Sequence, residues 1–136
     1  MFKRALLCVL CLSFSCSFLM AEEEPIEKKS DYQYFELEPD IITNYVKAGK
    51  RVGYIRLTVE LMADSGRAYE LISDHEPLIR DKIISILGQQ KEAIVKSVVD
   101  RDEIRQRCLE EVNELLFKET GEKPVYDLFF TKYLYQ

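Results

Sequence analysis

The chain has 136 residues, of which 47% are hydrophobic and 32% charged, and it contains only five Gly and four Pro. This length and composition allow one globular domain with a single core, and they exclude a second domain and long low-complexity segments. The net charge is -5, and basic and acidic side chains are interleaved along the chain. Nucleic acid is therefore not expected as a partner, because binding to phosphates needs a basic face.

The first 21 residues predict export across the inner membrane of a bacterium. Lys3 and Arg4 form a short basic head, residues 5–21 carry no charge, and an acidic run follows from Glu22. The basic head of such a segment stays in the cytoplasm, so the rest of the chain is expected on the periplasmic side of the inner (plasma) membrane. The uncharged run lies between the lengths of a signal peptide and of a membrane anchor, which leaves both open.

The residues before the acidic run do not decide whether the segment is cleaved. Ser15 and Ser17 are small residues of the kind that a signal peptidase reads, whereas Leu19 disfavours a cut after Ala21. Lipidation at Cys16 is the least favoured alternative, because Ser13, three positions upstream, stands where an apolar residue is expected. Beyond this segment the only cysteine is Cys108, so a disulfide framework is excluded, and its place in a helical apolar stripe predicts a small core residue.

Residues 22–31 are charged and aperiodic and predict a linker, and residues 32–136 are expected to form the folded domain. Two short extended segments come first, over residues 32–37 and 41–46. Residues 52–63 then alternate strictly between apolar and polar side chains, as in Ile55, Arg56, Leu57 and Thr58. This alternation predicts a strand with one face buried.

Helical spacing of apolar residues takes over after Gly66. It predicts a helix that starts near Ala68, a helix from Pro77 to Gly88, a short helix over residues 91–98, and a longer helix with an apolar stripe. Asp100 or Asp102 is the expected N-cap of the long helix, and Gly121 is its expected end. The stripe consists of Ile104, Cys108, Leu109, Val112, Leu115 and Leu116.

The chain ends in an aromatic segment over residues 125–136 that predicts a further strand. Strict alternation would place one set of its side chains on each face, Tyr126, Leu128 and Phe130 on one and Phe129, Tyr133 and Tyr135 on the other. Core packing and cross-strand pairing account for such rings, but rings on both faces also predict that another subunit covers one face. Strands, then helices, then a returning strand predict an α+β fold, with helices packed on one face of a small, mainly antiparallel sheet.

No residue pattern points to catalysis, a metal or a cofactor. His75 is the only histidine and is interpreted as a helix-entry residue, because no second histidine follows at the spacing of a zinc-protease helix. The acidic cluster 100–103 lacks the alternating oxygen ligands and the glycine of a calcium loop. No serine lies in a Gly-x-Ser-x-Gly turn. A binding or assembly protein is therefore favoured over an enzyme.

Several short motifs, taken in order, resemble the FliL family of flagellar basal body-associated proteins. They are residues 34–37 with Pro39, residues 54–57, the helix entry Glu76 to Asp81, Val112-Asn113 in the long helix, and Leu128 to Thr131 with a final Gln136. The resemblance covers about residues 32–136. The chain departs from the family's usual pattern at its short head and apolar segment, and at residues 100–102, where a Gly is usual.

The resemblance implies a non-enzymatic protein that supports the stator of the flagellar motor, and thereby swimming, swarming and chemotaxis. The partners it implies are stator and basal-body components, further copies of the chain in a ring, and the inner membrane if the N-terminal segment is retained. The candidate interaction residues are Tyr126, Phe129, Tyr133 and Tyr135, joined by Arg80 and Asp81 of the helix entry. The alternative is a soluble periplasmic adaptor with the same fold and a non-flagellar partner.

Overall fold

A computed structural model describes residues 31–136 of the chain. Four strands, four α-helices and one short 3-10 helix (η1) make up this part. In chain order they are β1 (Gln33–Glu36), β2 (Ile41–Val46), η1 (Ala48–Lys50), β3 (Val52–Ala63), α1 (Gly66–Asp74), α2 (Glu76–Gly88), α3 (Glu92–Lys96), α4 (Val98–Thr120) and β4 (Asp127–Tyr135).

The sheet is built around β3, and all of its pairings are antiparallel. β2 pairs with the first half of β3, from Val52 to Leu57, and β1 pairs with the second half, from Glu60 to Ala63. β4 pairs with β3 from Ile55 to Met62. Because a strand has only two edges, β1 and β2 share one edge of β3 and β4 occupies the other. The long alternating strand predicted from the sequence is therefore the centre of the sheet.

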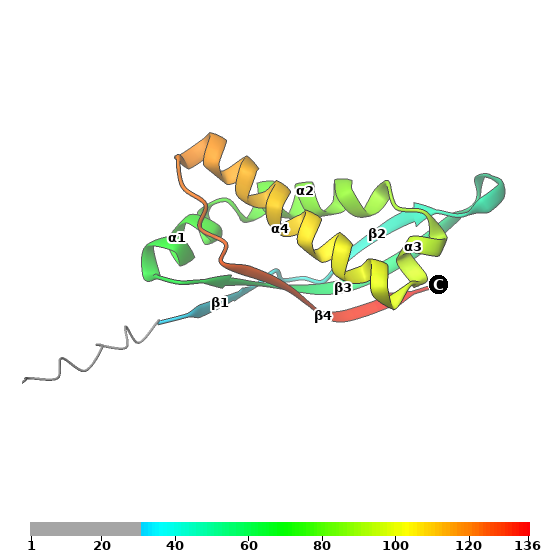
Figure 1. The fold of residues 1–136 in the computed structure, drawn as a ribbon, viewed down its shortest axis with the longest axis horizontal. Helices are drawn as coiled ribbons and strands as arrows, with labels where there is room; N and C mark the ends of the chain where they lie inside the picture. The colour runs from blue at the N-terminus through cyan, green and yellow to red at the C-terminus, as the bar shows by residue number, and fades with distance from the viewer. Residues whose placement is uncertain (1–30) are drawn as a thin grey trace, which may run out of the picture.

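The helices cover one face of this sheet. In Figure 1, α2 and α4 run side by side above the strands, with α1 near one end and α3 near the other. The N-terminal end of β1 lies at the end of the molecule near α1, and the hairpin between β2 and β3 extends to the opposite end. The predicted α+β fold, with its helices on one face and a C-terminal strand that returns to the sheet, is confirmed.

The core lies between the helices and the strands. Alternate residues of β3 point into it, and the helices contribute apolar residues at helical spacing. Its fully buried members include Ile55, Leu57, Val59, Leu61, Ile79, Ile83, Cys108, Val112 and Leu116. Burial raises the pKa of the Cys108 thiol to about 12, so this cysteine is a core residue, as the stripe predicted.

The ends of α4 confirm one prediction and correct another. Gly121 ends the helix in a left-handed conformation with φ of 78°, as predicted. The N-cap, however, is Ser97, whose side-chain oxygen accepts a hydrogen bond from the backbone N–H of Asp100 at 3.2 Å. The prediction of Asp100 or Asp102 as the cap is wrong, because the helix begins at Val98 and Asp100 lies in its first turn.

The segment before β4 is fixed to α4 by one side chain. Asn113 donates a hydrogen bond to the backbone oxygen of Val125 at 2.7 Å and accepts one from the backbone N–H of Val125 at 3.0 Å. These two hydrogen bonds fix the backbone of Val125 against α4, just before β4 enters the sheet. The expected export segment, residues 1–21, and nearly all of the expected linker, residues 22–31, lie outside the described residues.

Candidate interaction face

The face of the sheet turned away from α2 and α4 is the main candidate for a binding surface, and we call it the outer face. On β3 it is formed by the residues that alternate with the buried ones, and on the other strands by their partners in register. Its members include Tyr34, Glu36, Ile42, Asn44, Val46, Val52, Tyr54, Arg56, Thr58, Glu60, Met62, Phe129, Lys132 and Leu134.

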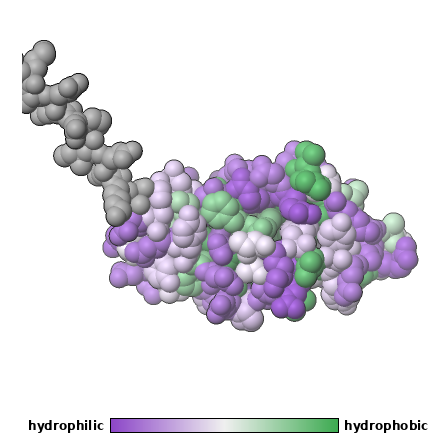
Figure 2. All heavy atoms as spheres, turned by 90° about the horizontal axis from the view of Figure 1, so that it is seen from below, coloured by the Kyte–Doolittle hydropathy of each residue, from purple (hydrophilic) through white to green (hydrophobic). Residues whose placement is uncertain are grey.

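Large apolar side chains are exposed on the outer face. Their exposed fractions run from 50% for Val52 to 65% for Ile42, with Tyr34, Val46, Tyr54 and Leu134 in between. In the view onto this side of the molecule, apolar residues form patches between polar ones (Figure 2). A solvent-facing side of an antiparallel sheet is normally polar. Grouped apolar side chains of this size are typical of a surface that another protein covers.

The centre of the outer face is held by the carboxylate of Asp40, in the turn between β1 and β2. It accepts hydrogen bonds from the hydroxyl of Thr58 at 2.6 Å and from Nε of Arg56 at 2.7 Å, and Nζ of Lys132 lies 3.5 Å away. The hydrogen bond from Thr58, then that from Arg56, lowers the pKa of Asp40 to about 2. Asp40 is therefore ionised at neutral pH and joins the turn to β3 and β4.

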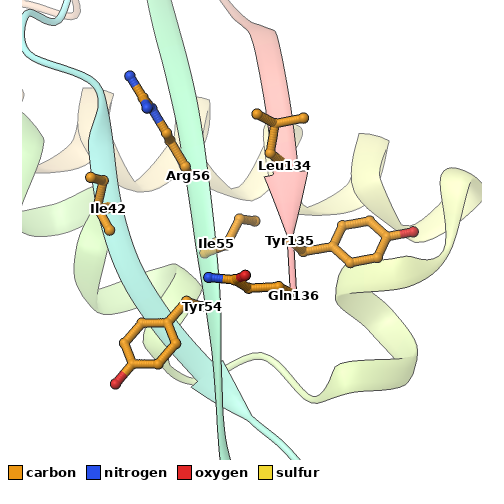
Figure 3. A pocket seen from close by; sticks show the side chains of 7 residues that line it. All are labelled: Ile42, Tyr54, Ile55, Arg56, Leu134, Tyr135 and Gln136. Carbon is orange, nitrogen blue, oxygen red and sulfur yellow. The ribbon is translucent and has the colours of Figure 1, made fainter.

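A shallow hollow of about 320 Å³ lies on this face near the end of β4. Figure 3 shows Ile42, Arg56 and Leu134 projecting from three neighbouring strands, while Tyr135 points away from them. The hollow is lined by Ile42, Tyr54, Ile55, Arg56, Leu134, Tyr135 and Gln136. Because its walls are mainly apolar and Arg56 supplies a positive charge at one side, it fits an apolar side chain next to an acidic group.

A bulge in β4 changes which aromatic residues share a face. Thr58 of β3 pairs with Lys132 and the next residue, Val59, pairs with Phe130, so Thr131 is an extra residue in β4. The bulge shifts the alternation by one position. The prediction that Tyr133 and Tyr135 share a face with Phe129 is therefore wrong: both pair with core-facing residues of β3, whereas Phe129 pairs with Glu60 on the outer face.

Tyr133 belongs to the packing between the sheet and the helices. Its hydroxyl donates a hydrogen bond to the backbone oxygen of Val95 at 3.0 Å, and the guanidinium carbon of Arg101 lies 4.1 Å from its ring centre. Burial raises the pKa of Tyr133. Its ring is also 5.9 Å from that of Phe130 and 6.3 Å from that of Tyr135, which is itself 41% exposed at the end of the strand.

Two of the predicted aromatic residues lie near the other end of the sheet. The ring of Tyr126, which is 57% exposed, is 5.0 Å from that of Tyr32. The ring of Phe129 is 6.4 Å from that of Tyr34 on the outer face. The first pair joins the residue before β4 to the residue before β1, and the second pair joins β4 to β1. They extend the aromatic surface towards the point where the described chain begins.

Arg80 and Asp81 lie on α2, in the helix layer, and are not part of the outer face. Arg80 donates hydrogen bonds to the carboxylate of Glu76 at 2.7 Å and to the backbone oxygen of Pro39 at 2.8 Å. It thereby joins the start of α2 to the turn between β1 and β2, a structural role that the residue type alone did not indicate. Asp81 is exposed on the same helix.

Sequence reasoning missed most of the outer face. The sequence pattern indicates Ile42, Arg56 and Leu134 only as members of strands, although they alternate with apolar residues that are buried. The sequence did not say that all helices would lie on one side and leave this face open. Only the sheet order brings these three residues, which come from three strands, next to one another.

The described part of the chain contains no cluster of three or more His, Cys, Asp or Glu side chains that could hold a metal ion. His75 stands at the junction of α1 and α2, with Nδ1 2.8 Å from the backbone oxygen of Leu71, which fits its interpretation as a helix-entry residue. Among residues 31–136 no helix is long and apolar enough to cross a membrane.

Comparison with known proteins agrees with the resemblance seen in the motifs. A family model described as "Flagellar basal body-associated protein FliL" matches residues 34–136. A curated relative, "Flagellar protein FliL" of Aquifex aeolicus (strain VF5), is 24% identical over 102 residues, which is 75% of this chain and 60% of the relative. The chain therefore matches somewhat less than two thirds of that relative's length.

Proposed function

Because the chain belongs to the FliL family of flagellar basal body-associated proteins, we propose that it is a non-enzymatic protein that supports the stator units of the flagellar motor. In this role it contributes to swimming and swarming, and so to chemotaxis. Its folded domain acts on the periplasmic side of the inner membrane, at the basal body. There it contacts stator or basal-body components and further copies of itself in a ring.

The observation that carries this proposal is the open outer face. A structural protein of an assembly needs a rigid surface that its partners cover, and β3 provides one because its other face is fixed against α2 and α4. The outer face groups large exposed apolar side chains around the ion pair of Asp40 with Arg56, and grouped apolar side chains of this size are typical of a surface that another protein covers.

The periplasmic placement rests on the charge pattern of the first 24 residues, which lie outside the described structure. If residues 1–21 are retained, they anchor the domain to the inner membrane, with residues 22–31 as a linker. If they are removed, the domain reaches the basal body from the periplasm. Mass spectrometry of the N-terminus of the mature protein, with fractionation of membranes, separates these two forms.

The proposal predicts that a strain lacking the gene swims and swarms poorly in soft agar and under viscous load, and that the full-length gene restores motility. Ile42→Asp should fail to restore it, because the charge falls on the most exposed apolar side chain of the outer face. The matched control is Val99→Asp, at a residue that is 77% exposed but lies at the start of α4. Val99→Asp should change the free energy of unfolding by less than about 0.5 kcal/mol, since the side chain is exposed. Ile42→Asp should lower it by about 1 kcal/mol at most, because Asp is disfavoured in a strand.

The motor role is contradicted if the deletion strain swims normally under load. In that case the adaptor alternative, with a non-flagellar envelope partner, takes its place. If Ile42→Asp and Val99→Asp both restore motility fully, the protein acts in the motor through another surface. Equal amounts of each variant in the cell, measured by immunoblot, are needed before the soft-agar diameters are compared.

A further inference from the structure

One end of the domain is basic, although the domain as a whole is acidic. Residues 31–136 contain 15 Lys or Arg and 20 Asp or Glu. Lys47 and Arg51 belong to the hairpin that joins β2 to β3, and Lys91 lies beside the hairpin, directly before α3. None of these three side chains forms an ion pair with any residue from 31 to 136. They are therefore free to meet a negative charge from outside the described chain.

The carboxylate of Glu92 lies among these positive charges. It forms an ion pair with Nζ of Lys96 at 2.7 Å, one turn further along α3. The hydrogen bond from Lys96 lowers the pKa of Glu92, and the nearby positive charges of Lys47 and Arg51 lower it further. Because Glu92 and Lys96 balance each other, Lys47, Arg51 and Lys91 leave three positive charges around the start of α3.

A hollow of about 530 Å³, which we call the basic hollow, lies between the hairpin and α3. Small apolar side chains share its lining with charged ones: Val46, Lys47, Ala48, Lys91, Glu92 and Ala93. The backbone N–H of Val46 donates a hydrogen bond to the backbone oxygen of Gln90 at 2.9 Å, which fixes the chain before α3 against β2. Asp100 and Glu103, at the start of α4, line a separate hollow. The basic hollow thus fits a ligand that carries carboxylates next to short apolar groups.

The basic hollow lies at the end of the domain that is farthest from the entry of the chain. β1 begins opposite Ala63, the last residue of β3, whereas the hairpin precedes Val52, the first residue of β3 (Figure 1). The twelve residues of β3 span roughly 40 Å. If residues 1–21 hold the protein in the inner membrane, the basic hollow is therefore at the end of the domain that can reach deepest into the periplasm.

We propose that the basic hollow binds the peptide stems of peptidoglycan, an anionic polymer of the periplasm. These stems are short peptides that carry free carboxylates and the methyl groups of alanine. The carboxylates meet Lys47, Arg51 and Lys91, and the methyl groups meet the small apolar side chains of the hollow. The inference rests on the proposed function, because it adds a contact with the cell wall to a domain that acts at the basal body in the periplasm.

The contact should be reversible and sensitive to salt. Ion pairs between exposed side chains and a ligand in water are screened, and each of them contributes little. An anionic lipid surface carries the same sign of charge, but the chain approaches the membrane from the opposite end of the domain. The cell wall is therefore the anionic partner that the position of the basic hollow favours.

The test mixes the protein, purified in mild detergent in the form that its host produces, with purified peptidoglycan sacculi, and measures the fraction that sediments with them. The wild type should sediment at low salt and be released as the salt concentration rises. Arg51→Glu combined with Lys91→Glu should lower the bound fraction about tenfold or more, because like charges then meet. Both residues are exposed. The control is Lys118→Glu combined with Lys123→Glu, the same change in charge at exposed residues near the other end of the domain. Equal melting temperatures of the two double variants show that both are folded.

Sacculi whose carboxylates are converted into neutral amides, by carbodiimide coupling to an amine, test the chemistry of the ligand. The wild type should no longer sediment with them. The inference is overturned if amidated sacculi bind the wild type as well as untreated ones do, or if the wild type does not bind untreated sacculi. It is also overturned if the Arg51 and Lys91 reversal binds sacculi as the control does. A reversal that lowers binding only to vesicles of phosphatidylglycerol would identify a lipid surface as the ligand instead.

Soft-agar motility of the deletion strain judges the proposed function independently of these measurements. A deletion strain that swims poorly, although the wild-type protein fails to bind sacculi, would remove the wall contact and leave the motor role in place. A deletion strain that swims normally, with a wild-type protein that binds sacculi through the basic hollow, would leave the wall contact in place and remove the motor role.

Discussion

At the scale of single residues, Asp40 has the largest effect on the outer face, because three side chains from two strands converge on it. Its pKa in the folded protein, about 2, lies below the usual value of an aspartate. The unfolded chain therefore binds a proton at a higher pH than the folded protein does. The stability that Asp40 contributes is complete above about pH 5 and is lost as the pH falls towards 2.

We accordingly expect Asp40→Asn to lower the melting temperature at pH 7, where the carboxylate is charged in the wild type. The difference between variant and wild type should shrink as the pH falls from 5 to 2, because the wild-type carboxylate is then protonated. Thermal unfolding followed by circular dichroism at pH 7, 5, 3 and 2 measures this. Asp81→Asn, at an exposed position of α2, is the matched control. If the difference in melting temperature between Asp40→Asn and the wild type stayed constant from pH 7 to pH 2, the ionised state of Asp40 would not be the source of the stability.

Gly53 leaves room for the ring of Tyr45, a packing role that the strand pattern of the sequence does not indicate. A Cβ atom at this position would lie 2.2 Å from the ring of Tyr45, its partner on β2. Tyr45 is buried, and its hydroxyl donates a hydrogen bond to the backbone oxygen of Gln136 at 3.1 Å. The glycine thus leaves the space in which a ring packs against the sheet.

Gly53→Ala should therefore lower the free energy of unfolding by about 1–3 kcal/mol, because the ring of Tyr45 must move out of a filled core. Chemical denaturation gives this value directly. Gly66→Ala is the control, since a Cβ atom at Gly66 would meet nothing within 4 Å. Equal stability of the Gly53→Ala variant and the wild type would mean that the ring has room to shift.

At the scale of elements, a helix cap determines where α3 ends and α4 begins, and a bulge determines which side chains of β4 lie on each face of the sheet. Ser97 lies between α3 and α4, ends the first and caps the second. The extra residue Thr131 turns the last part of β4 over, which sends Tyr133 towards the helices and leaves Leu134 on the outer face. The bulge changes the direction of side chains without changing which elements form.

The cap assignment gives a prediction that discriminates between neighbouring residues. Ser97→Ala should cost about 1 kcal/mol of stability, because the backbone N–H of Asp100 loses its acceptor. Asp102→Ala should change stability by less than about 0.5 kcal/mol, since this exposed residue only pairs with Arg105 on the helix surface. Urea unfolding of the two variants compares them. If Asp102→Ala lowered stability more than Ser97→Ala, the N-cap of α4 would lie in the acidic cluster and not at Ser97.

At the scale of the whole molecule, the two faces of the sheet have different roles. One face is filled by α2 and α4 and makes the domain rigid, and the other is left open with apolar side chains around a charged centre. Motility with Ile42→Asp tests this face at the molecular scale, because it asks whether the motor needs the outer face.

The sequence by itself determined the elements and the fold class. Alternation in β3, helical spacing in α2 and α4, and Gly121 at a helix end are local patterns, so they were readable without knowledge of contacts. The order of the motifs likewise identified the family. Strand and helix patterns report how a chain meets solvent and core over a few residues, and that information is contained in the local sequence.

Only the tertiary structure decided which residues form the candidate site. The bulge at Thr131 reverses the faces that strict alternation assigned to Tyr133 and Tyr135. The outer face joins residues from all four strands, and it is open because every helix of residues 31–136 lies on the other side. Register and layer order depend on long-range contacts, so no local pattern could have given them.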